Sequence, residues 1–236
     1  MNLRKAVFAM AEAKGVLLPA YVVADESGSM APYQRELGDG VASLCEKLRA
    51  EPMVAAKLRL AVLGFSDDVQ VRLAVADMRT ETTVPRLVIR GVTNYQAVFE
   101  DLLQRIPGDV KWLRGEGYRV HRPVVFLLSD GQPTDGSSWH APHAELTDRD
   151  RTPTAPNIIA CGLGDAWAQT MVKVATRPEF AFLAKSGTDV GRAISEFFHS
   201  LTMSLVASGH ALNSANPQLV VNRPDQFTMA IDEVGR

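Results

Sequence analysis

The sequence has little that would indicate a disulfide-stabilised or nucleic-acid-binding protein. Only two of its 236 residues are cysteines, Cys45 and Cys161, and both lie in apolar segments. We expect them to be small buried side chains of a protein in a reducing compartment, with a disulfide between them as the alternative. The formal net charge is only −2 and the basic residues are scattered, so no basic surface for nucleic acid or an anionic membrane is predicted.

Long apolar runs are also missing. No segment reaches the roughly 18 uninterrupted apolar residues of a membrane-spanning helix. Near the N-terminus, Arg4 and Lys5 precede the apolar run Ala6–Met10, but Glu12 and Lys14 interrupt it sooner than a secretory signal would allow. We therefore expect a cytoplasmic protein that crosses no membrane. A hydrophobic fraction of 46% is nevertheless sufficient for a full core.

Strand-like apolar runs alternate with amphipathic segments of helical period between about residues 16 and 206. This alternation predicts an α/β fold with a doubly wound, mostly parallel central sheet flanked by helices on both faces. We divide the chain into an N-terminal extension (1–15), one domain (16–207) and a C-terminal tail (208–236). The tail either docks on the domain, pairs at a sheet edge or contacts a partner.

The expected elements follow from continuous apolar runs for strands and from four-residue spacing for helices. Strands are predicted at Gly15–Asp25, Leu58–Phe65, Val69–Val75, Val124–Leu128, Asn157–Leu163 and, as a weak edge strand, Glu179–Leu183. Helices are predicted at Pro32–Glu51, from Thr93 to a stop at Pro107-Gly108, at Ala166–Ala175 and from Thr188 to Ala207. The stretch from Gly131 to Pro156 is predicted to be a long functional loop with one helical turn near Glu145.

Three polar loops follow, or lie near, the ends of apolar elements, and such loops converge where the strand order of a doubly wound sheet reverses. Together they supply two carboxylates and three hydroxyls: Asp25, Ser27, Ser29, Thr93 and Asp130. Oxygen ligands suit Mg²⁺ (or Mn²⁺), whereas softer metals prefer imidazole or thiolate. The sequence therefore predicts a site for a divalent cation that keeps room for one more anionic oxygen.

These five residues resemble the metal-ion-dependent adhesion site (MIDAS) of von Willebrand factor A (VWA) domains, written Asp-x-Ser-x-Ser, then Thr, then Asp commonly followed by Gly. The resemblance covers the predicted α/β domain. It implies that Ser27 and Ser29 bind the ion directly and that Thr93 binds directly or through water. Asp25 and Asp130 would often act through water, and a Glu or Asp carboxylate of a protein partner would complete the coordination. It implies a binding protein, so no catalytic residue is predicted.

A narrower resemblance is to TerY-type single-domain proteins of bacterial tellurite resistance. It rests on Leu128–Asp135 followed by Trp139, and on Asn157–Gly164. It implies a stress-response or tellurite-resistance setting, with kinase or phosphatase components of the same system as candidate partners.

The roles of four further acidic residues near the predicted site are inferred from their positions in the sequence. Glu26 lies between Asp25 and Ser27, so its side chain should point away from the ion as a solvated charge. Asp135 either lies just beyond the ligands of the ion or caps the segment that follows it. Asp67 and Asp68 are expected to form the turn of a hairpin.

Two histidines and two aromatic residues near the same loops each have two possible roles. His140 and His143 are expected to line the rim, and a zinc site is the alternative, although no further ligand for a tetrahedral site is nearby. Tyr95 and Trp139 either contact the partner or pack within their loops.

A different functional class is a magnesium-dependent phosphoryl-transfer hydrolase in which Asp25 is the nucleophile and Ser129 holds the phosphate. Haloacid-dehalogenase-like phosphatases need a second Asp where this chain has Ser27. The sequence also lacks a P-loop and a G-x-S-x-G elbow. We therefore expect no enzyme. A further hypothesis is that ligand capture near Thr93 shifts the last helix and changes how the tail, Ser208–Arg236, docks.

Overall fold

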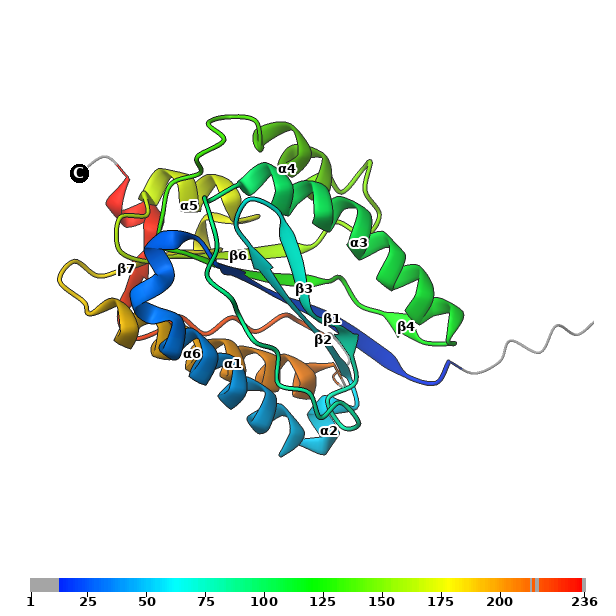
Figure 1. The fold of residues 1–236 in the computed structure, drawn as a ribbon. Coiled ribbons are helices and arrows are strands. Elements are labelled where there is room, and N and C mark those ends of the chain that lie inside the picture. The colour runs from blue at the N-terminus through cyan, green and yellow to red at the C-terminus, as the bar shows by residue number, and fades with distance from the viewer. Residues whose placement is uncertain (1–12, 213, 215–216, 235–236) are drawn as a thin grey trace, which may run out of the picture.

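The computed structural model describes residues 13–212, 214 and 217–234. Its centre is an eight-stranded sheet with the order β3-β2-β1-β5-β6-β7-β8, and β4 pairs separately with β1 (Figure 1). The β2–β3 and β7–β8 pairs are antiparallel and the other pairs are parallel. The strands are β1 Val16–Asp25, β2 Leu58–Phe65, β3 Val69–Ala76, β4 Arg119–Val120, β5 Val124–Ser129, β6 Asn157–Gly162, β7 Ala181–Ala184 and β8 Phe227–Met229. The predicted mostly parallel α/β fold is confirmed.

Helices cover both faces of this sheet, with α1, α2 and α6 on one face and α3, α4 and α5 on the other (Figure 1). The α-helices are α1 Gln34–Arg49, α2 Pro52–Ala55, α3 Tyr95–Gly115, α4 His140–Thr147, α5 Ala168–Val174 and α6 Val190–Ala211. Short 3-10 helices are η1 Gly28–Tyr33, η2 Pro178–Phe180 and η3 Ala230–Glu233. Most of the predicted N-terminal extension, residues 1–12, lies outside the described residues.

Strand β1 shows why its sequence is continuously apolar. Successive side chains of a strand point to opposite faces of the sheet. Ala20, Val22 and Ala24 pack into the core cluster that includes buried residues of α1 and α6. Tyr21 and Val23 pack into the cluster that includes buried residues of α3. Both faces of β1 are therefore buried, as is typical of a parallel sheet covered by two helical layers.

The strand order brings the predicted ligand loops together at the carboxyl ends of the two central strands, β1 and β5. After β1 the chain builds β2 and β3 on one side, and it then returns to place β5 on the other side of β1. The reversal falls between β1 and β5, whose carboxyl ends point in the same direction because they are parallel. In doubly wound sheets this is the position at which ligands bind.

Helix α3 is longer than predicted. The expected stop at Pro107-Gly108 is wrong, because α3 continues to Gly115 with Pro107 inside it. A proline removes one helical hydrogen bond, but Val110 and Leu113 beyond it are buried and extend the apolar face. Tertiary packing thus overrides the local stop signal.

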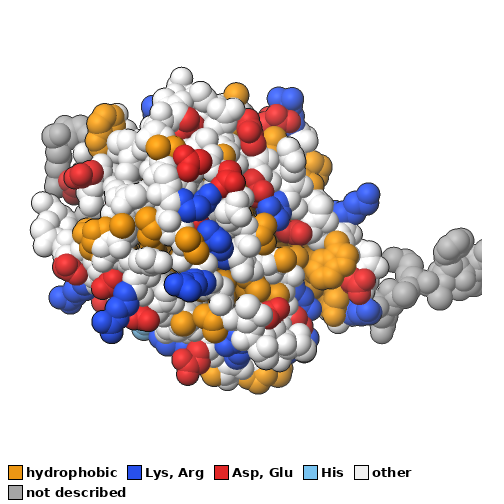
Figure 2. All heavy atoms as spheres, viewed as in Figure 1, with side chains coloured by type: hydrophobic (Ala, Val, Ile, Leu, Met, Phe, Trp, Pro, Cys, Tyr) orange, Lys and Arg blue, Asp and Glu red, His pale blue; other side chains and the backbone are white. Residues whose placement is uncertain are grey.

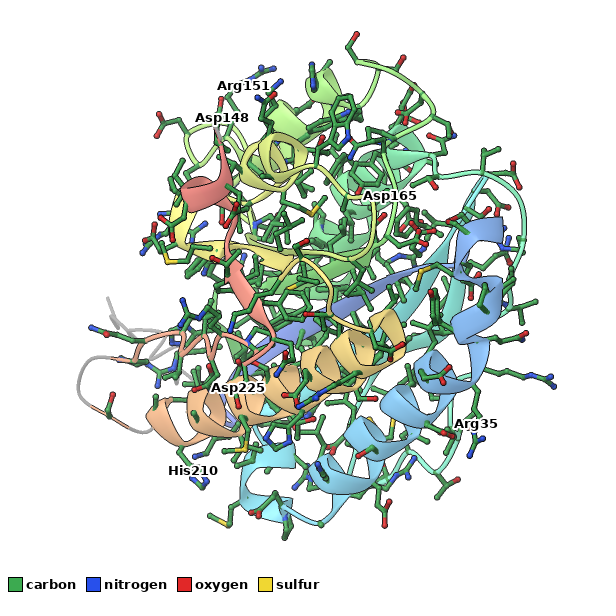
Figure 3. The ribbon with its side chains drawn as sticks, turned by 90° about the vertical axis from the view of Figure 1, so that its left-hand side faces the viewer. Arg35, Asp148, Arg151, Asp165, His210 and Asp225 are labelled. Carbon is green, nitrogen blue, oxygen red and sulfur yellow. The ribbon has the colours of Figure 1, made fainter. Side chains whose placement is uncertain are left out.

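The tail docks on the domain and also pairs at the sheet edge. Ser200, Ser204 and Ser208 are spaced four residues apart on α6. Ser204 Oγ accepts a hydrogen bond from the Asn222 N–H at 2.9 Å, and Ser208 Oγ accepts one from the Val220 N–H at 2.9 Å. Ser200 Oγ donates to the Asn222 carbonyl. Figure 3 shows this part of the tail, near Asp225, lying along α6.

Beyond this contact, β8 pairs with β7. The strand predicted at Glu179–Leu183 is present as β7, but its predicted position at the sheet edge is wrong, because β7 lies between β6 and β8. Only three residues form β8, too few to give a strand pattern in the sequence. The predicted start of the last helix is also corrected, since Asp189 rather than Thr188 is the cap and accepts a hydrogen bond from the Arg192 N–H.

Both cysteines are buried and free, as expected, so the alternative of a disulfide is wrong. Within the described part of the chain, no helix has both the length and the apolar character needed to cross a membrane.

Candidate metal site

Asp25 is the last residue of β1, and its side chain is completely buried. Its Oδ1 accepts the N–H of Ser27 at 2.8 Å, and its Oδ2 accepts the hydroxyl of Ser129 at 2.5 Å. The first bond folds the loop after β1 back on the carboxylate. The second ties β1 to the end of β5. Asp25 therefore fixes the relative positions of two of the three predicted ligand loops.

A chain of hydrogen bonds joins the next residues of the predicted set. Ser27 Oγ and Ser29 Oγ are 3.0 Å apart, and Ser29 Oγ donates to Asp130 Oδ1 at 2.8 Å. Neighbouring ligands of an octahedral Mg²⁺ ion, each about 2.1 Å from the metal, are themselves about 3 Å apart. The observed oxygen spacings therefore match those of adjacent ligands around one such ion.

Thr93 is brought to the same place by the segment that precedes α3. Its carbonyl accepts hydrogen bonds from the N–H of Thr134 at 2.9 Å and from the Thr134 hydroxyl at 3.0 Å. A Cβ placed on Gly131 would lie 3.5 Å from Thr93 Oγ1, so this hydroxyl lies beside the residue that follows Asp130. Thr93, like Ser27, is almost completely buried, whereas Ser29 is exposed. The cluster is thus open to solvent at Ser29.

The two carboxylates of the cluster are poorly hydrated. Burial raises the pKa of Asp25 to about 6, although hydrogen bonds from Ser129 and Ser27 lower it in part. Burial also raises the pKa of Asp130, and the hydrogen bond from Ser29 opposes that shift. Carboxylates that have lost water are stabilised by a nearby cation. Two carboxylates and three hydroxyls are an all-oxygen donor set, so the residues present fit a hard divalent cation.

The two histidines predicted to line the rim lie in α4, where His143 is partly buried and His140 is exposed. His143 Nε2 is 2.9 Å from the carbonyl oxygen of Val174, and its ring lies against Phe99 at a centroid distance of 4.8 Å. His140 stacks edge-on against Trp139. Among the described residues, no three His, Cys, Asp or Glu side chains are grouped as metal ligands. The predicted site contains only two carboxylates and is not of that type.

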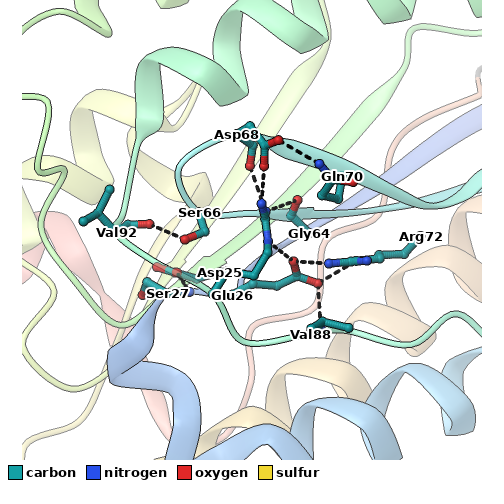
Figure 4. A network of polar contacts seen from close by, with 11 residues as sticks. Asp25, Glu26, Ser27, Gly64, Ser66, Asp68, Gln70, Arg72, Val88 and Val92 are labelled. Carbon is teal, nitrogen blue, oxygen red and sulfur yellow. Dashed lines mark hydrogen bonds and ion pairs between the residues drawn. The ribbon is translucent and has the colours of Figure 1, made fainter.

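Glu26 does not have the predicted environment. It was expected to be a solvated charge, but its side chain is fully buried and forms ion pairs with Arg72 and Arg90 (Figure 4). The prediction of solvation is therefore wrong. Asp68 lies in the turn between β2 and β3, as expected, and it also pairs with Arg90.

The aromatic residues predicted to lie at the site mouth are part of the core. Tyr95 is fully buried and Trp139 is 3% exposed, and their ring centroids are 6.0 Å apart. The interpretation as ordinary packing is therefore correct for both. The expectation that Asp135 caps the segment following it is wrong. Its carboxylate binds the first turn of α3, which precedes it in the sequence, and accepts the N–H groups of Tyr95 at 3.1 Å and Gln96 at 2.9 Å.

An aromatic residue that the sequence did not single out is exposed on the loop after β6. Trp167 is 65% exposed and precedes α5. Gln132, two residues after Asp130, is hydrogen-bonded to residues on both sides of the tryptophan, Asp165 in the loop and Thr170 in α5. Its Nε2 donates to the Asp165 carbonyl at 3.3 Å, and its Oε1 accepts the hydroxyl of Thr170 at 2.8 Å. The segment that carries Trp167 is thus tied to the loop that follows Asp130. Elsewhere, the face shown in Figure 2 carries acidic and basic side chains intermixed.

Comparison with known proteins shows similarity at the level of structure only. No protein family matches the sequence, and no curated protein matches it. Proximal thread matrix protein 1 from the mussel byssus superposes with a TM-score of 0.57 at 18% identity, over 82% of this chain and 49% of that chain. Another structure of that protein is described as having a zinc-occupied MIDAS motif, with a TM-score of 0.50, 18% identity and coverage of 80% and 45%.

Two bacterial structures are similar in the same way. A von Willebrand factor type A structure from Catenulispora acidiphila has a TM-score of 0.55 at 13% identity, covering 81% of this chain and 43% of that one. The pilus adhesin SpaC from Lactobacillus rhamnosus GG has a TM-score of 0.61 at 12% identity, covering 83% and 31%. The chain spans less than half the length of each of these proteins. At such identities the comparisons show that this chain has a VWA-type fold.

Proposed function

We propose that this protein is a metal-dependent interaction module that captures an acidic side chain of a partner protein through a bound Mg²⁺ or Mn²⁺ ion. The observation that carries the proposal is the convergence of the Ser27, Ser29 and Asp130 oxygens at about 3 Å spacing, with Asp25 and Thr93 beside them. The zinc-occupied MIDAS motif of a structural neighbour supports a divalent cation at this place in the fold.

Each residue has a role in this proposal. Ser27 and Ser29 supply hydroxyl oxygens to the ion, and Thr93 binds directly or through water. Asp25 and Asp130 accept hydrogen bonds from those hydroxyls or from ion-bound waters. Because neutral hydroxyls neutralise little charge, the ion remains able to accept one more anionic oxygen, which a Glu or Asp of the partner provides. The exposed side at Ser29 is where that carboxylate enters.

The setting of this module rests on the sequence. From the resemblance to TerY-type proteins we infer a cytoplasmic protein of a bacterial stress-response or tellurite-resistance system, with kinase or phosphatase components as candidate partners. The names of the structural neighbours, a thread matrix protein and a pilus adhesin, agree with a binding role in general.

The alternative, a phosphoryl-transfer hydrolase with Asp25 as nucleophile, fits less well. Asp25 is completely buried, and both of its oxygens already accept hydrogen bonds, from Ser27 and Ser129. A nucleophilic carboxylate has to present one oxygen to the phosphorus atom. Incubation with p-nitrophenyl phosphate and Mg²⁺ separates the two functions, since a hydrolase releases p-nitrophenol and a binding module does not.

Calorimetric titration of Mg²⁺ and Mn²⁺ into metal-stripped protein tests the proposal. Wild-type protein should bind one ion, and Ser27→Ala should bind it at least about tenfold more weakly because one ligand is lost. The matched control is Ser195→Ala, an exposed serine on α6 whose hydroxyl bonds only to the Gly191 carbonyl. Added acetate should tighten metal binding by the same factor by which the metal tightens acetate binding. Equal affinity in wild type and Ser27→Ala would contradict the proposal.

A further inference from the structure

Glu26 lies in the middle of the proposed ligand loop, yet its carboxylate is fully buried and belongs to a separate network (Figure 4). Arg72 binds it with two parallel hydrogen bonds, Nε to Oε1 at 2.8 Å and Nη2 to Oε2 at 2.7 Å. Arg90 Nε donates to Oε2 at 3.1 Å, and the Val88 N–H donates to Oε1 at 2.8 Å. A buried carboxylate is tolerated only when it is paired and hydrogen-bonded, as this one is.

The network connects parts of the chain that are far apart in sequence. Glu26 follows β1 and Arg72 lies on β3, on the far side of β2. The carboxylate reaches Arg72 over Gly64 of β2. A Cβ at Gly64 would lie only 2.1 Å from the Glu26 carboxyl carbon, so a glycine is required at this position in the strand. Glycine inside a strand is typical of such a close approach.

The third partner, Arg90, belongs to the segment that carries Thr93. The Arg90 N–H donates to the Glu26 carbonyl at 2.6 Å, and the Gly28 N–H donates to the Gly91 carbonyl at 2.9 Å. The Arg90 side chain also pairs with Asp68 and donates to the Asp68 carbonyl at 2.9 Å. The segment is thus bound both to the loop after β1 and to the turn between β2 and β3, at a point three residues before Thr93.

We propose that Glu26 is a positioning residue that places Thr93 relative to Ser27 and Ser29 and thereby sets the affinity for the metal ion; this rests on the proposed function. Two features of Glu26 act together. Its backbone and side chain join the loop after β1 to the Thr93 segment. Its charge, with that of Asp68, also balances the two arginines, so that no excess positive charge lies next to the cation.

The test compares metal binding with local structure in three variants. Glu26→Gln removes the charge and leaves Arg72 without its ion-pair partner. Arg90→Lys keeps the charge but loses the planar donor group, which makes it the milder variant should Glu26→Gln fold poorly. Asp77→Asn is the matched control. Asp77 also pairs with two arginines, Arg59 at 3.3 Å and Arg79 at 2.6 Å. It follows the C-terminal end of β3, whereas Asp68 of the Glu26 network precedes the N-terminal end.

Mg²⁺ and Mn²⁺ are titrated into each metal-stripped protein. Replacement of a residue that contacts the metal ligands without touching the ion typically lowers metal affinity by about 10–100-fold. We expect such a loss in Glu26→Gln and a smaller loss in the same direction in Arg90→Lys. Asp77→Asn should retain wild-type affinity even if its melting temperature falls, which separates positioning from general stability.

Hydrogen exchange of the metal-free proteins gives a second readout that needs no metal. Amides of residues 88–94 should exchange faster in Glu26→Gln than in wild type, while β5 is unchanged. Wild-type metal affinity in both Glu26→Gln and Arg90→Lys would overturn the inference. Failure of wild-type protein itself to bind either metal, with or without acetate, would overturn the proposed function and this inference with it.

Discussion

Replacement of Gly64 by alanine tests whether the buried Glu26 network has the geometry described above. The new Cβ would lie 2.1 Å from both the carboxyl carbon and Oε1 of Glu26, and 2.5 Å from Oε2. Contacts this short cannot be tolerated, so the carboxylate has to move. Any movement away from β2 lengthens its two hydrogen bonds with Arg72, which are 2.7 and 2.8 Å long.

The size of the effect follows from two contributions. Forcing one extra methyl group into a packed site costs about 1–3 kcal/mol. Complete loss of one partner of a buried ion pair costs about 3–5 kcal/mol. Because Glu26 would keep part of its hydrogen bonding, we expect the free energy of unfolding to fall by about 3 kcal/mol. For a chain of this size the melting temperature should then fall by roughly 10 °C.

Urea denaturation in the presence of EDTA measures this change without any contribution from bound metal. The matched control is Gly38→Ala in α1, where an added Cβ has no atom within 4 Å. That substitution should stabilise the protein by up to about 1 kcal/mol, because alanine is a better helix former than glycine. If Gly64→Ala and Gly38→Ala had the same stability within error, the close approach of Glu26 to β2 would be refuted.

Two further predictions concern the tail and the rim of the site. Ser204→Ala should leave the Asn222 N–H without its hydrogen-bond partner, so the amides of residues 219–229 should exchange faster in hydrogen-exchange mass spectrometry. The control Ser195→Ala should leave their exchange unchanged. Unchanged exchange in Ser204→Ala would contradict the docking described for the tail. The same measurement on wild type, with and without Mg²⁺ and acetate, tests the hypothesis that ligand capture changes tail docking. Trp167→Ala should leave Mg²⁺ affinity unchanged but weaken capture of an acidic partner by about tenfold or more, because exposed tryptophans at binding sites often dominate affinity. Trp112→Ala, which removes a tryptophan 52% exposed on α3, is the control, and an equal effect of both on partner affinity would refute a role for Trp167.

The strands and their order along the chain were predictable because buried parallel strands are continuous apolar runs. The bounds of β2, Leu58–Phe65, are those predicted, and β1 differs by one residue. The end of α3 was not predictable from local signals, since Pro107 and Gly108 normally stop a helix. The buried stripe beyond them decided the outcome. The three-residue strand β8 has no pattern of its own and forms only because the edge of β7 is available.

The grouping of the five candidate residues follows from their order in the sequence, whereas their surroundings do not, and their role as metal ligands stays a prediction. The order of Asp25, Ser27, Ser29, Thr93 and Asp130 is visible in the sequence, and the sheet topology brings these residues together. The environment of Glu26 was not visible, because Arg72 and Arg90 are 46 and 64 residues away in sequence. One available signal was Gly64, a glycine inside an otherwise apolar strand, which indicates the close approach of another group.

A crystal structure of the protein grown with Mn²⁺ would show whether a divalent ion binds among the oxygens of Asp25, Ser27, Ser29, Thr93 and Asp130. Anomalous scattering locates manganese without reference to the protein atoms. We expect one anomalous peak at about 2.1–2.2 Å from both Ser27 Oγ and Ser29 Oγ, with Thr93 and Asp130 at direct or water-mediated distance. The absence of a peak there, with Ser29 still hydrogen-bonded to Asp130 at saturating Mn²⁺ and acetate, would contradict the proposed metal site.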